Sequence, residues 1–221
     1  MTYAAKGRLS DWTTGEKNAP LTPAQQMQIM HGVANGVAYI HKKNVIHRDI
    51  KPDNVLLDDQ MNPMLGDFGL SLRIGIDDLS VIGGTAPYIA PELLLLTHHH
   101  SEKSDIYAFS LLCWCIIARA IEPYNSMAIE ELKKQVAHNN LRETIPSDCP
   151  ENVKNAITKG WDRNPDKRPD AEEILRMLNG TSNTIRLSES VHSFLSEFSS
   201  CCSKLFINCN ENKVPFTRQI L

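Results

Sequence analysis

Apolar residues recur every three or four positions between residues 21 and 43, a spacing that predicts one long amphipathic helix. Thr22 can cap the first turn of this helix, and Gln25 can complete a capping box. The apolar stripe consists of Met27, Met30, Ala34, Val37, Ala38 and His41. Basic and turn-prone residues at 42–44 favour the end of the helix, and Val45–Ile46 then predicts a short extended segment.

Two short apolar runs follow, residues 55–57 and 64–65, and the residues between them are typical of a turn. This pattern predicts a β-hairpin. Because antiparallel strands return the chain to its starting point, we expect Asn54, just before the first strand, to lie beside Asp67, just after the second. The hairpin would thus bring together two side chains that carry oxygen ligands.

Helical spacing of apolar residues dominates the remainder, so the predicted fold is mainly α with short β-hairpins. The expected helices cover about residues 104–119, 126–138, 150–160 and 170–178. The first of these is apolar on every side, which is typical of a helix surrounded by others, and its Cys113 and Cys115 should be inert core residues. His98-His99-His100 is predicted to be an exposed linker, because three consecutive side chains diverge too far to share a metal ion.

The C-terminal residues 181–221 predict a separate tail, in which a Ser/Thr/Asn linker at 181–184 precedes an amphipathic helix. The apolar stripe of that helix is Val191, Phe194, Leu195, Phe198, Cys202 and Leu205. Such a stripe can dock on its own domain or on a partner. The adjacent Cys201 and Cys202 are in addition candidates for reversible acylation.

Composition excludes several classes of protein. Lys and Arg number 23 against 26 Asp and Glu, a formal charge of -3, which offers no basic field for a nucleic acid. The most apolar run, residues 106–117, is far shorter than the roughly 20 residues that cross a bilayer, so no transmembrane segment is predicted. Neither disulfide spacing nor a secretory signal is evident, which favours the cytoplasm.

Four short motifs stand in order along the chain. Residues 47–54, HRDIKPDN, resemble the catalytic loop of eukaryotic-type protein kinases, and Asp67-Phe68-Gly69 resembles the metal-binding motif of that family. Ala90-Pro91-Glu92 and residues 161–169 resemble two later kinase motifs, and the last of them is similar to tyrosine-kinase-like serine/threonine kinases. The resemblance implies a C-terminal lobe of a protein kinase over residues 1–180, followed by the tail.

The resemblance implies ATP-dependent phosphoryl transfer to protein substrates, with roles for five residues. Asp49 would accept or orient the proton of the attacking hydroxyl, and Lys51 would neutralise the γ-phosphate. Asn54 and Asp67 would hold Mg²⁺, since amide and carboxylate oxygens are its usual ligands. Leu56 would touch the adenine of ATP.

Substrate class and regulation follow from the same resemblance. Lys51 and Thr85 are typical of serine/threonine kinases, and Thr85 should bridge to the catalytic loop, although dual specificity stays open. Arg48 before the catalytic Asp implies control by a phosphate on the activation loop, for which Ser80 is the best-placed acceptor and Ser71 a second candidate.

Structural roles are also implied. Glu92 should pair with Arg168 beneath the substrate platform, and Asp105 should hold the backbone of the catalytic loop. His47 and Phe68 should pack against each other.

The opening residues 1–9 resemble the hinge between kinase lobes, and no glycine-rich phosphate loop or strand lysine is found. We therefore expect the N-terminal lobe to be absent from this chain and its activity alone to be weak. Two readings stay open: part of an active kinase domain, or a noncatalytic kinase-like module that binds partners. The intact Asp49, Asn54 and Asp67 favour the first.

Overall fold

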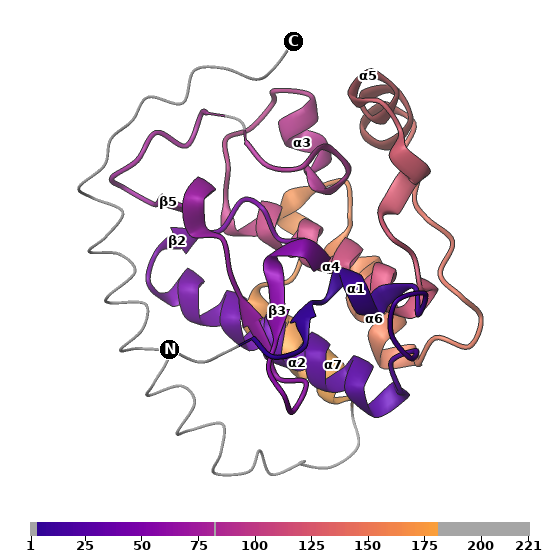
Figure 1. Cartoon of the computed structure of the whole chain (residues 1–221). Coiled ribbons are helices and arrows are strands. Elements are labelled where there is room, and N and C mark those ends of the chain that lie inside the picture. Colours follow the sequence, from indigo (N-terminus) through magenta and orange to yellow (C-terminus); the bar gives the residue numbers. More distant parts are fainter. Residues whose placement is uncertain (1–3, 82, 181–221) are drawn as a thin grey trace. The chain divides into compact units, whose positions relative to one another are not determined.

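Helices make up about half of the computed structural model, which describes residues 4–81 and 83–180 (Figure 1). The helices are α1 (Ser10–Thr13), α2 (Pro23–Lys42), α3 (Pro91–Leu94), α4 (Glu102–Ala118), α5 (Ile129–Leu132), α6 (Glu151–Gly160) and α7 (Ala171–Asn179). The strands are β1 (Gly7–Arg8), β2 (Val45–Ile46), β3 (Val55–Leu57), β4 (Pro63–Leu65) and β5 (Leu72–Arg73). Short helical turns are η1 (Pro52–Asn54), η2 (Phe68–Leu70), η3 (Ala86–Tyr88), η4 (Pro123–Ser126) and η6 (Pro165–Lys167), with a π-helix, η5 (Lys133–His138). The prediction of a mainly α fold with short antiparallel strands is confirmed.

The long helix α2 begins and ends where its sequence indicates. Thr22 caps it and forms the expected capping box with Gln25, and the C-terminal residue is Lys42. Gly32 allows α2 to lie against the hairpin, because a Cβ at this position would overlap the ring of Pro63. The helix therefore forms the base on which β4 rests.

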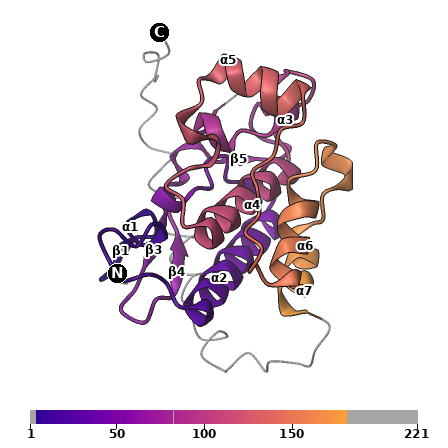
Figure 2. The same cartoon turned by 90° about the vertical axis from the view of Figure 1, so that its right-hand side faces the viewer.

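Helix α4 is the centre of the core. Every residue from Ser104 to Ile116 is buried, as expected for a helix that is apolar all round. It packs against α2 and α6, and α7 packs against both of those helices (Figure 2). Burial raises the pKa of the Cys113 thiol and raises that of Cys115 to about 12, so both are inert at neutral pH.

Two small antiparallel sheets shape the surface that carries the motifs. Strands β1, β3 and β4 form one sheet, in which Val55 pairs with Leu65, and β2 pairs with β5 in the other. The turn between β3 and β4 is held by Asp58, whose carboxylate accepts the backbone N–H groups of Gln60 and Asn62. The hairpin is thus as predicted.

Two predictions, one for the helix expected from residue 126 and one for the histidines at 98–100, are wrong in part. The helix expected from residue 126 starts at Ile129, after the turn η4, and its second half is π-helical. His98 and His99 are exposed as expected for a linker, but His100 is buried, because its ring turns inward toward the core.

The tail predictions, including the amphipathic helix and the acylation of Cys201 and Cys202, lie outside the described residues. No helix within residues 4–81 and 83–180 is both long and apolar enough to span a membrane.

Candidate active site

Asp49 lies at the centre of a hydrogen-bonded cluster on the loop between β2 and β3. It is 7% exposed. Oδ1 accepts the hydroxyl of Thr85 at 2.7 Å and its backbone N–H at 3.0 Å, while Oδ2 accepts the amide of Asn54 at 2.7 Å and lies 3.0 Å from Lys51 Nζ. Burial raises the pKa of Asp49, but these donors outweigh it and hold the pKa below its usual value. Asp49 is therefore a carboxylate at neutral pH.

Thr85 joins this loop to the segment that leads into η3. The Lys51 ammonium group donates to the Thr85 hydroxyl, which in turn donates to Asp49. The three side chains form a directional chain of hydrogen bonds, from a cation through a hydroxyl to an anion. Because charge-assisted hydrogen bonds are stronger than neutral ones, this chain fixes the position of the Asp49 carboxylate.

The expected meeting of Asn54 and Asp67 is seen in the backbone but not in the side chains. The Gly66 N–H donates to the Asn54 carbonyl at 2.8 Å, so the hairpin does bring the two positions together. The Asn54 amide nitrogen, however, donates to Asp49, and the Asp67 carboxylate accepts the Gly69 N–H at 3.3 Å. No hydrogen bond joins the two side chains in the described part of the chain. The left-handed backbone of Asp67, with φ 56°, starts η2 and directs the carboxylate onto its own turn.

The donor set of these two residues nevertheless fits a divalent cation. Both hydrogen bonds of the Asn54 amide nitrogen go to Asp49, which leaves the amide oxygen for a cation, and Asp67 is exposed. Mg²⁺ usually takes only one or two protein carboxylates and completes its shell with phosphates and water. Residues 4–81 and 83–180 hold no group of three or more His, Cys, Asp or Glu that could bind a metal ion.

Residues 1–178 match the family model described as "Protein tyrosine and serine/threonine kinase". The chain belongs to this protein kinase family. Over 176 residues it is 34% identical to a Dictyostelium discoideum protein named as a probable serine/threonine-protein kinase, covering 80% of this kinase chain and 12% of that relative.

Two further relatives carry kinase names. Dual specificity protein kinase shkC of D. discoideum is 34% identical over 161 residues, with 70% of this chain and 31% of the relative covered. Serine/threonine/tyrosine-protein kinase HT1 of Arabidopsis thaliana is 29% identical over 177 residues, covering 80% of this chain and 45% of the relative. The kinase chain thus spans less than half the length of each of these relatives.

A buried carboxylate from α4 supports the backbone of residues 47–54, here called the kinase loop. Asp105 accepts the backbone N–H groups of His47 at 2.8 Å and Arg48 at 2.9 Å. Its Oδ2 also lies 2.9 Å from His41 Nε2 at the end of α2. The hydrogen bonds outweigh burial and lower the pKa of Asp105. His41 was predicted only as a member of the apolar stripe. Because a polar ring on a buried face needs a hydrogen-bond partner, its place in that stripe could have indicated a buried polar contact.

Replacing Asp105 with asparagine is expected to destabilise the fold, because an amide has one acceptor oxygen and its NH₂ group would face a backbone N–H. Each buried amide left unpaired costs about 1 to 3 kcal/mol. Urea unfolding measures the loss, and the exposed Asp166→Asn is the control. An unchanged unfolding midpoint in the Asp105 variant would show that this carboxylate does not hold the loop.

His47 and Phe68 are in edge-to-face contact, with ring centroids 4.8 Å apart. Burial lowers the pKa of His47, so the ring is neutral at neutral pH. Nδ1 accepts the Asp49 N–H at 3.3 Å, and Nε2 lies 2.9 Å from the Gly66 carbonyl, which together assign the proton to Nε2. The ring thus links the kinase loop to the strand end that precedes Asp67.

Arg48 fastens the kinase loop to residues 70–81. Its guanidinium donates to the carbonyls of Leu70, at 3.2 Å, and Val81. Its own backbone is left-handed, with φ 73°, a conformation that costs an Arg about 1 to 3 kcal/mol. Gly84, with φ +112°, lies so close that a Cβ there would sit 2.6 Å from the Arg48 carbonyl oxygen. The close approach and the positive φ both require glycine.

The two serines predicted as phosphate acceptors lie in different surroundings. The exposed Ser80 donates to an Asp78 carboxylate oxygen at 2.6 Å. Ser71 is half-buried and donates to the His47 carbonyl at 3.4 Å. Of the two, only Ser80 presents its hydroxyl on the surface.

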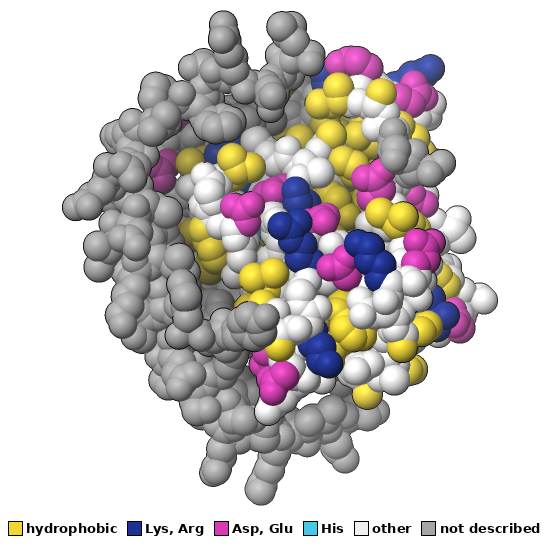
Figure 3. Space-filling view, in the orientation of Figure 1, with side chains coloured by type: hydrophobic (Ala, Val, Ile, Leu, Met, Phe, Trp, Pro, Cys, Tyr) yellow, Lys and Arg dark blue, Asp and Glu magenta, His cyan; other side chains and the backbone are white. Residues whose placement is uncertain are grey.

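The remaining predicted residues also have defined positions. Arg168 and Glu92 form a bidentate pair, with Nη1–Oε1 at 2.7 Å and Nη2–Oε2 at 2.6 Å. Leu56 pairs with Met64 and Arg8 in the three-stranded sheet and is half-buried. Figure 3 shows basic and acidic side chains side by side on one face of the molecule, so that face carries no broad field of one sign.

Proposed function

We propose that this chain takes part in ATP-dependent phosphoryl transfer to Ser and Thr hydroxyls of protein substrates. The observation that carries the proposal is the cluster in which Thr85, Lys51 and Asn54 all bind the carboxylate of Asp49. Such a cluster positions an ionised acceptor beside a cation, and positioning and electrostatic stabilisation supply most of the catalysis in phosphoryl transfer.

Asp49, Lys51 and Thr85 have distinct tasks in this proposal. Asp49 accepts or orients the proton of the substrate hydroxyl, for which its ionised state is required. Lys51 places positive charge beside that hydroxyl and balances charge on the transferred group. Thr85 holds Asp49 and Lys51 in register, and it presents the following segment as the platform for the substrate.

Asn54 and Asp67 are the proposed metal ligands, and Leu56 is proposed to contact the adenine of ATP. Mg²⁺ held by these two residues would supply positive charge against the phosphates of ATP. Asp67 Oδ1 accepts the Gly69 N–H, so a cation bound through this oxygen would replace that hydrogen bond. That hydrogen bond, at 3.3 Å, is long and exposed, so its exchange for a cation costs little.

Substrate class is supported by the bond between Lys51 and Thr85 and by the names of the relatives, which include serine/threonine and dual-specificity kinases.

We also propose residues 1–180 as a kinase lobe and 181–221 as a tail that docks in cis or on a partner, in a cytoplasmic protein. A phosphate at Ser80 would adjoin Val81, which Arg48 binds, but Asp78 would oppose it as a like charge.

Transfer of labelled γ-phosphate from ATP to casein tests the proposal, with this chain and with a longer protein that contains it. We expect Mg²⁺-dependent labelling of Ser and Thr, and a loss of about 100-fold or more in Asp67→Asn, because electrostatic stabilisation of this kind is worth several kcal/mol. Asp59→Asn, on the exposed hairpin turn, is the matched control. Equal labelling with and without Mg²⁺, or in Asp67→Asn and the parent protein, contradicts the assignment, and no labelling in either protein favours the noncatalytic module.

A further inference from the structure

His100 is a buried histidine whose ring has no hydrogen-bond partner. It is 3% exposed, and no described residue hydrogen-bonds either Nδ1 or Nε2. Buried polar atoms are nearly always paired, because an unpaired one costs free energy. The ring therefore occupies this position at a cost, and neither the proposed catalytic cluster nor the metal ligands make use of it.

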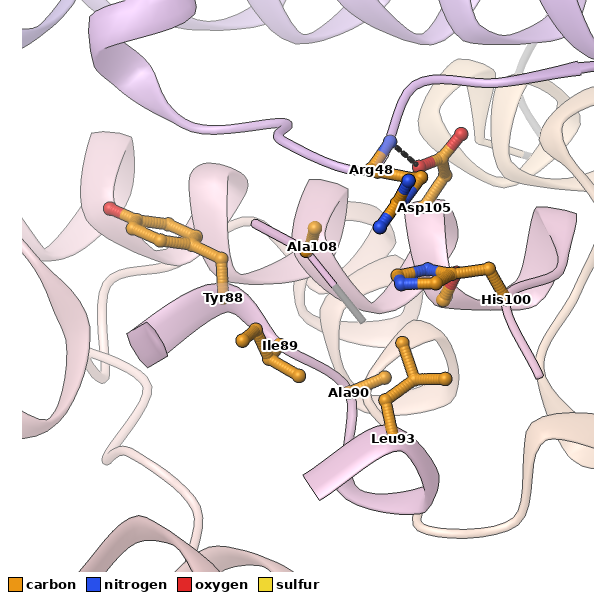
Figure 4. Close-up of a pocket in the computed structure, with 10 residues that line it drawn as sticks. Arg48, Tyr88, Ile89, Ala90, Leu93, His100, Asp105 and Ala108 are labelled. Atoms are coloured by element: carbon orange, nitrogen blue, oxygen red, sulfur yellow. Dashed lines mark hydrogen bonds between the residues drawn. The ribbon is translucent and has the colours of Figure 1, made fainter. Parts of the chain in front are cut away.

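The ring faces the guanidinium of Arg48 across a small cavity. Figure 4 shows Arg48 pointing toward His100 from the kinase loop, with Asp105 beside the arginine. Arg48 Nε is also buried without a hydrogen bond among the described residues. The cavity volume is about 10 Å³, room for roughly one water molecule and for no larger ligand. A charge on the ring would therefore be poorly solvated.

Arg48 and His100 both bind the backbone of residues 70–81. Arg48 binds the carbonyls of Leu70 and Val81, as described above. The backbone N–H of His100 donates to the Leu79 carbonyl at 3.1 Å. A force that separates the His100 ring from the Arg48 guanidinium would thus pull apart the attachments of the segment at Leu79 and Val81.

Three other ionisable residues line the cavity: Arg48, Tyr88 and Asp105. Arg48 opposes a positive charge on His100 and Asp105 favours it, while burial raises the pKa of Tyr88 and keeps that phenol neutral. The Asp105 carboxylate already accepts two backbone N–H groups and lies against an imidazole, which reduces what it can offer to His100.

We propose that protonation of His100 places two like charges in this cavity and releases residues 70–81 from the kinase loop, so that acidification opens the segment. The proposal goes beyond the proposed phosphoryl transfer and needs none of it.

The direction and size of the effect follow from the pKa of the ring. Burial, and then Arg48, lower the pKa of His100 from 6.5 to about 4 in the closed structure. A ring released to solvent has the ordinary value, so protons bind the open state more tightly, and the closed state loses stability as pH falls from 6.5 toward 4. At about pH 5 the opening equilibrium should rise about 30-fold over its value at about pH 7.5.

Hydrogen exchange followed by mass spectrometry tests this in the full chain at about pH 5 and pH 7.5, with rates normalised for intrinsic exchange. The amide at position 100, which donates to Leu79, should exchange about 30-fold faster at the lower pH in the parent protein. His100→Gln and His100→Leu should remove most of this difference, and His99→Gln, a change at an exposed neighbour, should keep it. Equal acceleration in the parent protein and in a folded position-100 variant would overturn the proposal.

A second measurement needs no variant. In protein labelled with ¹³C-histidine, the ring resonances of His100 should titrate well below pH 6.5, together with amide shifts in residues 70–81. Titration at or above the ordinary value, or titration without any change in that segment, would equally reject the switch.

Discussion

Asp49→Asn is expected to lower kcat for phosphoryl transfer by about 10²- to 10⁴-fold, the contribution that general acid–base catalysis typically makes. The carboxylate accepts two hydrogen bonds from Thr85 and faces the donors of Asn54 and Lys51 with its other oxygen. An amide at this position has one acceptor oxygen and no negative charge. It cannot receive the substrate proton, and it offers the Lys51 ammonium group a neutral acceptor in place of a charged one, so the first function is lost and the second is weakened.

Measurement of kcat and KM for ATP separates these functions from nucleotide binding, because the residues proposed to contact ATP are intact in this variant. KM should change little while kcat falls. The matched control is Asp148→Asn, an exposed carboxylate on a distant loop. A loss of only a few-fold, in a variant whose thermal unfolding matches the parent protein, would remove Asp49 from the catalytic role.

The long-range fold was predictable wherever one face of an element is buried over several turns. Helix α2 was found from the period of its apolar residues, helix α4 from an apolar run that covers every side, and the hairpin from two apolar runs around a turn. Strands β1 and β5 escaped prediction, because each is two residues long and its pairing depends on neighbours distant in sequence. The π-helix also escaped prediction: it packs against α3, and no local sequence pattern distinguished its winding from that of an α-helix.

The site was predictable as a set of positions rather than as a set of contacts. Motif spacing located Asp49, Asn54 and Asp67, and strand pairing explains why their backbones meet. Which partner each side chain selects depends on backbone dihedrals such as the left-handed φ of Asp67, which the residue types alone do not fix.

The charged neighbours of two buried histidines were not predicted from the sequence. His41 and His100 lie in segments that read as an apolar stripe and as a solvated linker, yet both rings are buried beside charged groups. Their roles depend on tertiary neighbours that come from α4 and the kinase loop.

Arg168→Ala is expected to destabilise the fold by about 3 to 5 kcal/mol, the usual cost of leaving one partner of a buried ion pair bare. Arg168 and Glu92 are 2% and 5% exposed, so the abandoned carboxylate would have little access to water. Urea unfolding of the purified chain measures the effect. Arg176→Ala, a change at an exposed arginine of α7, should stay within about 0.5 kcal/mol of the parent protein.

Arg168→Lys should recover only part of this loss. The guanidinium binds both oxygens of Glu92, donates to the carbonyls of Lys103 and Asp162, and lies 5.0 Å from the ring centroid of Tyr107. A lysine carries the charge but cannot reproduce the planar fork, so the Lys variant should fall between the Ala variant and the parent protein. Equal stability of Arg168→Lys and the parent protein would show that charge alone suffices.

A double variant separates the bare charge from the lost carbonyl partners. Glu92→Leu combined with Arg168→Met removes both charges and fills the space with apolar groups, a change that is often neutral for a buried pair. Here the carbonyls of Lys103 and Asp162 would still lose their donor, each at about 1 to 3 kcal/mol. We therefore expect the double variant to be more stable than Arg168→Met alone and less stable than the parent protein. Full recovery of stability would mean that Arg168 serves only to neutralise Glu92. No recovery would mean that its main task is to bind the backbone carbonyls of Lys103 and Asp162.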